Sequence, residues 1–161
     1  MKPELCIVNL GEAERREMDW AAALGAPPER VVAMCGKLEM ELRALEPKER
    51  AEFMADLGIE HFSSEDVARK SYALLKALTF LTACPTEAHA WTIHEGDTAV
   101  IAAGKVHTDM ARGFIRAEVV AFEDLAKCGS MKEARARGRV RLEGRDYVVK
   151  DGDVIEFRFN V

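Results

Sequence analysis

The sequence predicts two architectures in succession, an α/β segment over residues 1–78 and an α+β domain over residues 79–161. In the first segment, all-apolar runs alternate with helical patterns, which is the strand–helix order of α/β proteins. In the second, several short strand patterns surround one short helix, as in small α+β domains. A chain of 161 residues with 48% hydrophobic content is large enough for one ordinary domain or two small ones.

The first segment begins with two strand–helix units. Residues 5–8 and 31–34 are apolar throughout, which predicts strands buried on both faces of a parallel sheet. A helix is expected over residues 11–23, and Pro27 and Pro28 are expected to stop it. Two strands do not make a doubly wound sheet, so the first strand would need further neighbours.

Helical patterns fill the rest of this segment. Residues 38–45 repeat leucine at helical spacing, and Pro47 suits the first turn of another helix that Gly58 ends. Residues 63–66 have the composition of a helix cap, and the apolar stripe then continues to residue 78. We expect the domain boundary near residues 78–80, where this pattern ends.

The second segment has a different pattern of short elements. Strand patterns occupy residues 79–83, 88–93, 115–122 and 155–161. A short helix is expected over residues 98–103, and residues 151–153 form the turn before the last strand. The last strand alternates apolar with polar residues, so one of its faces is expected to be buried.

Composition and charge exclude several classes of protein. A net charge of −5 argues against a protein that coats nucleic acid over its whole surface. The widely spaced Cys6, Cys35, Cys84 and Cys128 form no zinc pattern, and reduced thiols in the cytoplasm are expected. No apolar run approaches the roughly 18 residues of a membrane span, and no signal peptide is predicted.

Residues 127–145 are strongly basic. Seven basic and two acidic side chains give this segment a charge of +5 in nineteen residues. Two interpretations are open, a solvated helix and strand face or a patch that contacts phosphates. Few aromatic residues lie within the segment, so base stacking is not predicted there.

Three stretches carry a resemblance to a known family. The first is Asn9-Leu10-Gly11-Glu12, the second is Cys35-Gly36-Lys37, and the third is a series of motifs after residue 77. The series comprises residues 78–83, 90–93, 102–109, 112–115, 143–147 and 151–154. Together they resemble the C-terminal half of the YchF/Obg-like ATPases, a family of P-loop NTPases. The resemblance implies the end of a nucleotide-binding domain over residues 1–78 and a ubiquitin-like β-grasp domain, the TGS domain, over residues 79–161.

The resemblance also implies a set of nucleotide-binding residues. Asn9 and Glu12 stand where guanine-reading relatives have N-K-x-D, and the longer Glu12 removes the pair of hydrogen bonds by which the Asp carboxylate selects guanine. The family binds ATP, or GTP, with Mg²⁺. The cofactor-binding residues implied are Asn9, Leu10, Glu12, Cys35, Gly36 and Lys37. Alternatively, Asn9 is a strand-end turn residue and Glu12 a carboxylate in the first turn of a helix.

The motif that holds phosphates is absent from the sequence. No G-x-x-x-x-G-K-[ST] occurs, so neither a phosphate-cradling loop nor a magnesium-binding hydroxyl is predicted. We therefore expect a fragment of a ribosome-associated, translation-related ATPase that does not hydrolyse nucleotide alone and binds no cofactor by itself. The alternative is a stand-alone TGS module that binds RNA or protein without catalysis.

Partner-binding residues are expected in the second segment. The residues predicted to contact RNA or a partner are Lys105, His107, Lys132, Arg135, Arg137, Arg139 and Arg141. For His107 the alternative is a helix cap formed by Thr108 or Asp109. No catalytic residue and no metal site is predicted, because His89 and His94 lack a recognised ligand spacing. Self-association through the exposed sheet edge at residues 5–8 is also expected.

Overall fold

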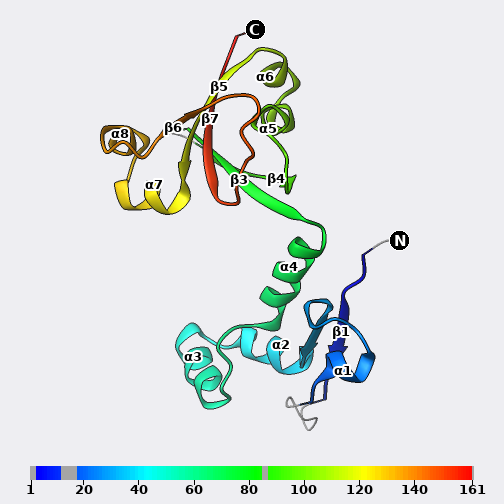
Figure 1. Cartoon of the computed structure of the whole chain (residues 1–161). Helices are drawn as coiled ribbons and strands as arrows, with labels where there is room; N and C mark the ends of the chain where they lie inside the picture. The colour runs from blue at the N-terminus through cyan, green and yellow to red at the C-terminus, as the bar shows by residue number, and fades with distance from the viewer. Residues whose placement is uncertain (1–2, 12–17, 85–86, 161) are drawn as a thin grey trace. The chain divides into compact units, whose positions relative to one another are not determined.

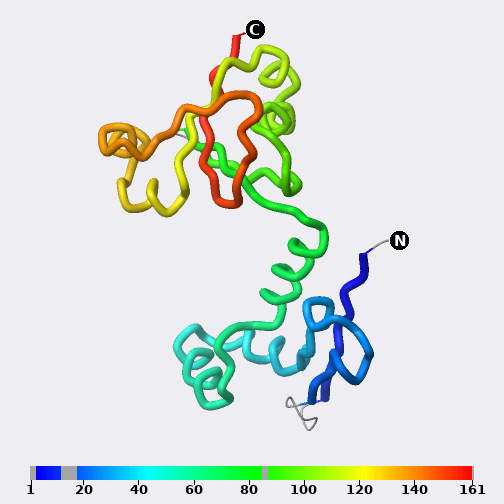
Figure 2. Tube along the Cα trace, in the orientation of Figure 1, coloured from blue at the N-terminus to red at the C-terminus, as the bar shows by residue number. Residues whose placement is uncertain are grey.

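The computed structural model describes residues 3–11, 18–84 and 87–160, and it divides into two compact units, Met1–Leu75 and Lys76–Val161. Figure 1 labels the helices and strands, and Figure 2 follows the Cα trace through them. The division lies a few residues before the predicted boundary, because strand β3 already begins at Ala77.

The first unit has a two-stranded parallel sheet and four α-helices among its described residues. Its elements are β1 (Cys6–Asn9), α1 (Trp20–Leu24), the 3-10 helix η1 (Pro28–Arg30), β2 (Val31–Met34), α2 (Gly36–Ala44), α3 (Pro47–Asp56) and α4 (Ser63–Leu74). The strands pair in register from Cys6 opposite Val31 to Asn9 opposite Met34.

The two strands differ in burial. Val31 and Val32 of β2 are buried, as the apolar run predicts. In β1, by contrast, Ile7 is 52% exposed, so the prediction of a strand buried on both faces is wrong. The physical reason is that β1 has only β2 beside it among the described residues.

The first helix is shorter than predicted. α1 covers only the end of the expected 11–23 span, and residues 12–17 of that span lie outside the described residues. Gly25 ends the helix in the left-handed conformation, and its N–H donates to the Ala21 and Ala22 carbonyls. The prolines that were expected to stop the helix come later, and Pro28 instead begins η1.

A long-range contact replaces the predicted cap at residues 63–66. The N-cap of α4 is Phe62, which makes no side-chain cap hydrogen bond. The buried Glu39 carboxylate of α2 instead accepts a hydrogen bond of 2.9 Å from the Ser63 N–H. A carboxylate at a helix N-terminus is favoured by both the free N–H groups and the helix dipole, so α2 supplies the cap of α4.

The second unit has a five-stranded sheet with helices on both faces. Its elements are β3 (Ala77–Cys84), β4 (Glu87–His94), α5 (Ala99–Val106), α6 (Thr108–Arg112), β5 (Phe114–Ala121), α7 (Phe122–Cys128), α8 (Met131–Ala136), β6 (Arg141–Glu143) and β7 (Asp153–Phe159). The strand order is β4-β3-β7-β5-β6. The β3–β7 pair is parallel and the other pairs are antiparallel.

Successive residues of the central strands enter two different cores. Phe80 and Val119 pack into the larger core, which includes the alanines of α5. Val120 and Val154 pack on the opposite face with Ala134 of α8. Figure 1 shows α5 and α6 on one side of this sheet and α7 and α8 on the other, so each strand is covered on alternate residues.

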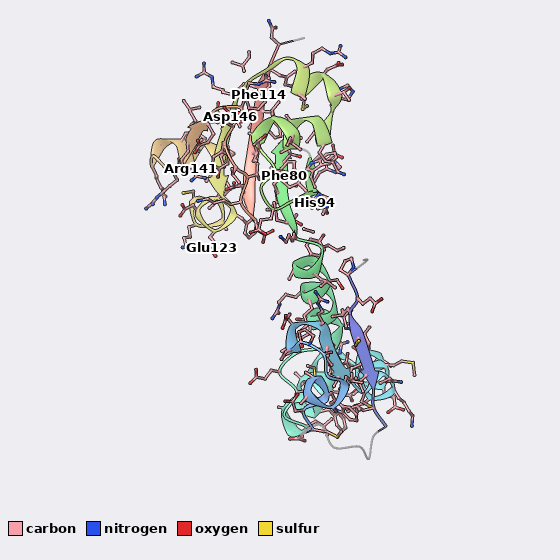
Figure 3. The ribbon with its side chains drawn as sticks, turned by 45° about the vertical axis from the view of Figure 1, so that its right-hand side comes forward. Phe80, His94, Phe114, Glu123, Arg141 and Asp146 are labelled. Atoms are coloured by element: carbon pink, nitrogen blue, oxygen red, sulfur yellow. The ribbon has the colours of Figure 1, made fainter. Side chains whose placement is uncertain are left out.

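Several short elements were not predicted from the sequence. These are α6, α7, α8 and β6, each of three to seven residues. Phe122 was expected in a strand but begins α7, whereas the predicted strands at 79–83 and 88–93 are confirmed. In Figure 3, Phe80 and Phe114 lie within the second unit, and the exposed Glu123, Arg141 and Asp146 lie at its surface.

Candidate functional site

The ends of β1 and β2 meet at a side-chain hydrogen bond. Asn9 is the last residue of β1, and its Oδ1 accepts a hydrogen bond of 3.0 Å from the Gly36 N–H at the start of α2. Leu10 follows, and its N–H donates to the Met34 carbonyl at 2.7 Å. The two loops of the predicted base pocket are therefore joined directly.

Glycine suits position 36 because of the same contact. An added Cβ would lie 3.2 Å from Asn9 Oδ1, which is tighter than ordinary packing. Cys35 and Leu10 are both buried beside this junction, while Lys37 is exposed and lies 3.8 Å from the Glu41 carboxylate. Glu12, the other half of the N-x-x-E motif, lies outside the described residues.

A pocket of about 320 Å³ opens beside these strand ends. Leu10 and Cys35 line it, but the other wall comes from the α3–α4 loop and the first turn of α4. That wall includes His61, whose Nε2 lies 3.0 Å from Asp66 Oδ2. Sequence reasoning missed this wall, since long-range contacts such as the Glu39–Ser63 hydrogen bond, which spans 24 residues, bring it to the strand ends.

The basic segment 127–145 separates into paired and unpaired cations. Arg137 lies 4.0 Å from Glu133, Arg141 contacts Glu143 and Asp153, and Arg145 lies over the Phe114 ring. Arg135 is paired with two glutamates. Among the described residues, three cations of the segment have no side-chain hydrogen bond or ion pair, and these are Lys127, Lys132 and Arg139.

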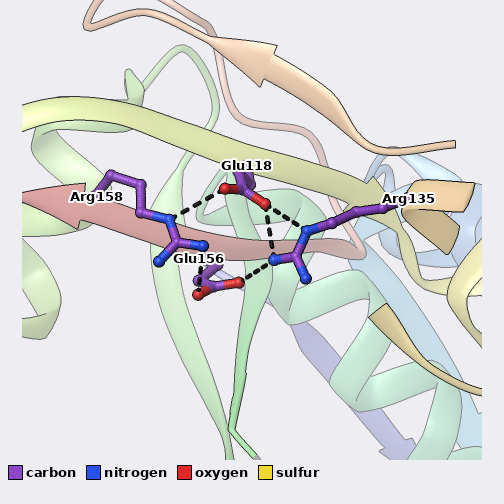
Figure 4. Close-up of polar contacts among 4 residues, drawn as sticks. All are labelled: Glu118, Arg135, Glu156 and Arg158. Carbon is purple, nitrogen blue, oxygen red and sulfur yellow. Dashed lines mark hydrogen bonds and ion pairs between the residues drawn. The ribbon is translucent and has the colours of Figure 1, made fainter. Parts of the chain in front are cut away.

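Arg135 belongs to a network of four charged residues (Figure 4). Glu118 of β5 accepts from Arg135 Nε at 2.8 Å and from Arg158 Nε at 3.0 Å. Glu156 of β7 accepts a hydrogen bond of 2.6 Å from Arg135 and forms an ion pair with Arg158 at 3.1 Å. We call Glu118, Arg135, Glu156 and Arg158 the ion-pair quartet.

The quartet changes the acidity of its members. Burial alone would raise the pKa of Glu118, but hydrogen bonds from Arg135 and Arg158 and their positive charges outweigh it, so the pKa lies below its ordinary value. The hydrogen bond to Glu118 raises the pKa of Arg135 in turn. Arg135 therefore holds α8 against the sheet as a charged group.

Lys105 and His107 do not join the rest of the predicted RNA-binding residues. They lie at the end of α5 and directly after it, whereas Lys132 and Arg135 belong to α8 on the opposite face of the sheet. His107 Nδ1 accepts a hydrogen bond of 3.2 Å from the Asp109 N–H. The cap of α6 is therefore His107 itself, rather than Thr108 or Asp109 as the alternative interpretation had it.

A second buried polar group lies at the start of β7. Asp153 is 3% exposed, and its Oδ2 accepts from the Tyr147 hydroxyl at 2.8 Å and from the Lys150 N–H at 2.9 Å. Burial, the hydrogen bond to Asp153 and the charge of that carboxylate raise the pKa of Tyr147 to about 12. The Asp153 carboxylate thus fixes the turn before β7.

Within the described parts of the chain, no three His, Cys, Asp or Glu side chains are grouped to hold a metal ion. In the same residues, no helix is both long and apolar enough to cross a membrane.

Comparison with protein families assigns the second unit. Residues 77–160 match the family YchF-GTPase_C, described as a protein of unknown function (DUF933). Because this match covers more than half of the sequence, the chain belongs to the YchF-GTPase_C family.

Similar proteins match along the whole chain. The ribosome-binding ATPase YchF of Bacillus subtilis is 42% identical over 99% of this chain, and that of Haemophilus influenzae is 44% identical over 100%. The human Obg-like ATPase 1 is 36% identical over 99% of this chain. The chain spans 46%, 46% and 42% of these proteins, respectively.

A solved structure has the same fold. The Schizosaccharomyces pombe YchF GTPase superposes with a TM-score of 0.82 and 24% identity, over 97% of this chain and 43% of that one. The similarity therefore extends through both units.

Proposed function

We propose that the chain is the C-terminal portion of a ribosome-associated ATPase of the YchF/Obg-like type. The observation that carries this proposal is the match, over almost the whole chain, to proteins named ribosome-binding ATPases. The first unit contributes the base-recognition part of the nucleotide domain. The second unit is a TGS domain of β-grasp type that contacts RNA of the ribosome, which places the protein in the cytoplasm.

The strand-end geometry supports the role in base recognition. Asn9 Oδ1 is occupied by the Gly36 N–H, and the amide nitrogen of the same side chain is a donor for an acceptor nitrogen of adenine. Leu10 and Cys35 give the junction an apolar side against which a base can pack. When ATP, or GTP, is bound with Mg²⁺, a phosphate-binding loop must come from sequence that these 161 residues do not contain.

The chain alone is expected to show no ATP turnover above background. The physical reason is that its sequence contains no G-x-x-x-x-G-K-[ST] to hold the β- and γ-phosphates and Mg²⁺. The measurement is phosphate release by the purified chain with ATP and Mg²⁺, with a P-loop protein of the same family as the positive control. Magnesium-dependent hydrolysis that co-purifies with the chain would refute this part of the proposal.

Ribosomal RNA binding is expected to depend on the unpaired cations. The triple variant Lys127→Ala, Lys132→Ala and Arg139→Ala should weaken binding and lower the slope of log affinity against log salt by about 2, because three phosphate contacts on a single strand account for about 0.7 each. The measurement is cosedimentation with ribosomes and titration with ribosomal RNA fragments at several salt concentrations.

Lys105→Ala on the other face of the sheet is the comparison for this test. It should leave the salt slope unchanged if only the α7–α8 face contacts RNA. A triple variant that keeps the affinity and the slope of the unmodified chain would remove the α7–α8 face from the proposal.

A further inference from the structure

A groove of about 690 Å³ lies beside the ion-pair quartet. One wall is formed by α7 and α8 with the turn between them, through Leu125, Ser130 and Met131. The other is formed by the ends of β3 and β7, including Ala83 and Cys84. Its volume is within the range of about 300–1,000 Å³ that small-ligand sites occupy.

The charged residues of the groove are mainly cationic. Lys132, Arg135 and Arg158 line it together with a single acid, Glu156. Lys132 has no ion-pair partner among the described residues, and the two guanidinium groups carry several N–H donors each. Such a set of side chains is complementary to an anion with several acceptor oxygens.

The two glutamates of the quartet differ in position. The Glu118 side chain is 14% exposed and does not line the groove, whereas the Glu156 side chain is 38% exposed and does. Glu118 therefore holds both guanidinium groups from outside the groove lining. Glu156, which lines the groove, occupies N–H groups of both arginines that an incoming anion would need.

We propose that this groove binds a phosphodiester group of single-stranded RNA, with Lys132, Arg135 and Arg158 as its ligands. Glu118 is a positioning residue that pre-orients the two arginines. Glu156 competes with the phosphate for the same N–H groups and so weakens binding. This inference rests on the proposed RNA-binding function of the second unit, and it assigns opposite effects to two acids that contact the same arginines.

The decisive variant is Glu156→Gln in the full 161-residue chain. An amide oxygen still accepts from the arginines, but the competing negative charge is gone, so affinity for a short oligouridylate should rise about three- to tenfold. Glu133→Gln in α8 is the matched control. It makes the same charge change beside Arg137 and outside the groove, so we expect less than about a twofold rise from long-range electrostatics.

Two further variants test the ligands. Lys132→Ala should lower the affinity about three- to tenfold without changing the melting temperature, because Lys132 is exposed and unpaired. Glu118→Gln should also lower the affinity, because it loosens the two arginines. The double variant Glu118→Gln and Glu156→Gln should therefore bind RNA more weakly than Glu156→Gln alone. Competition by uridine monophosphate tests whether the bound phosphate group belongs to an RNA chain or to a free nucleotide.

If Glu156→Gln and Glu133→Gln bind RNA with equal affinity, the groove is not the binding site, but the RNA-binding function remains. Competition by uridine monophosphate as strong as by the oligouridylate overturns RNA as the occupant in favour of a free nucleotide. Absence of RNA binding in every variant overturns both proposals. A rise confined to Glu156→Gln, with a fall for Lys132→Ala, supports the groove.

Discussion

Gly113→Ala is expected to destabilise the second unit by about 3 kcal/mol or more, because the site has no room for a side chain. An added Cβ would lie 1.8 Å from the Asn160 carbonyl oxygen and 2.8 Å from its carbon. The neighbouring backbone cannot move away easily, since the Asn160 N–H also donates to the Gly113 carbonyl at 2.9 Å. For a unit of this size, the melting temperature should fall by on the order of 10 °C or more.

Gly144→Ala is the control for this substitution. A Cβ at position 144 would meet nothing within 4 Å, so its effect should remain within about 0.5 kcal/mol. Thermal unfolding followed by circular dichroism measures both variants. Equal melting temperatures for the two would contradict the close approach between the start of β5 and the end of β7.

Asp153→Ala is expected to cost about 2–4 kcal/mol. The substitution removes the acceptor of the Tyr147 hydroxyl and of the Lys150 N–H, and it leaves Arg141 without one of its anionic partners. Denaturant unfolding measures the loss, with Asp146→Ala as the control in the same unit. Asp146 is exposed and has no ion pair among the described residues, so its replacement should change stability by less than about 0.5 kcal/mol.

Titration of Tyr147 gives a second test of the same contact. In a Tyr72→Phe background, the Tyr147 pKa should be about 12 in the parent and should move towards 10.0 in Asp153→Ala. Because the folded pKa is raised, the stability contributed by the protonated phenol is complete below about pH 10 and is lost as the pH rises through 12. An unchanged phenol pKa would contradict the hydrogen bond as a cause of the shift.

Local patterns predicted most strands and several helices. The run at residues 31–34 is a strand, although only Val31 and Val32 are buried and Ala33 is exposed. Pro47 begins α3, and Gly58, with φ of 64°, follows its end, because backbone preference acts within a few residues. The short α7 and α8 were missed because each has fewer than two full turns, too few for a 3.6-residue period to show.

Contacts between residues far apart in the chain account for the remaining differences between the sequence prediction and the structure. The cap of α4 comes from Glu39, 24 residues before Ser63, and no local pattern at 63–66 could indicate it. In the basic segment, Arg135 finds Glu118 and Glu156, which are 17 and 21 residues away in the chain. A charge count along the sequence therefore could not show which cations already have an acidic partner within the chain.

The place of β7 in the sheet has a consequence for synthesis of the protein. β7 lies between β3 and β5, yet it is the last strand to be made, and the Thr79 N–H pairs with the Asp151 carboxylate 72 residues later. Until residues 153–159 leave the ribosome, β3–β4 and β5–β6 are separate antiparallel pairs, and the edges of β3 and β5 that will meet β7 are open. The second unit therefore cannot complete its sheet before β7 has left the ribosome, and its nascent chain is exposed to mispairing until then.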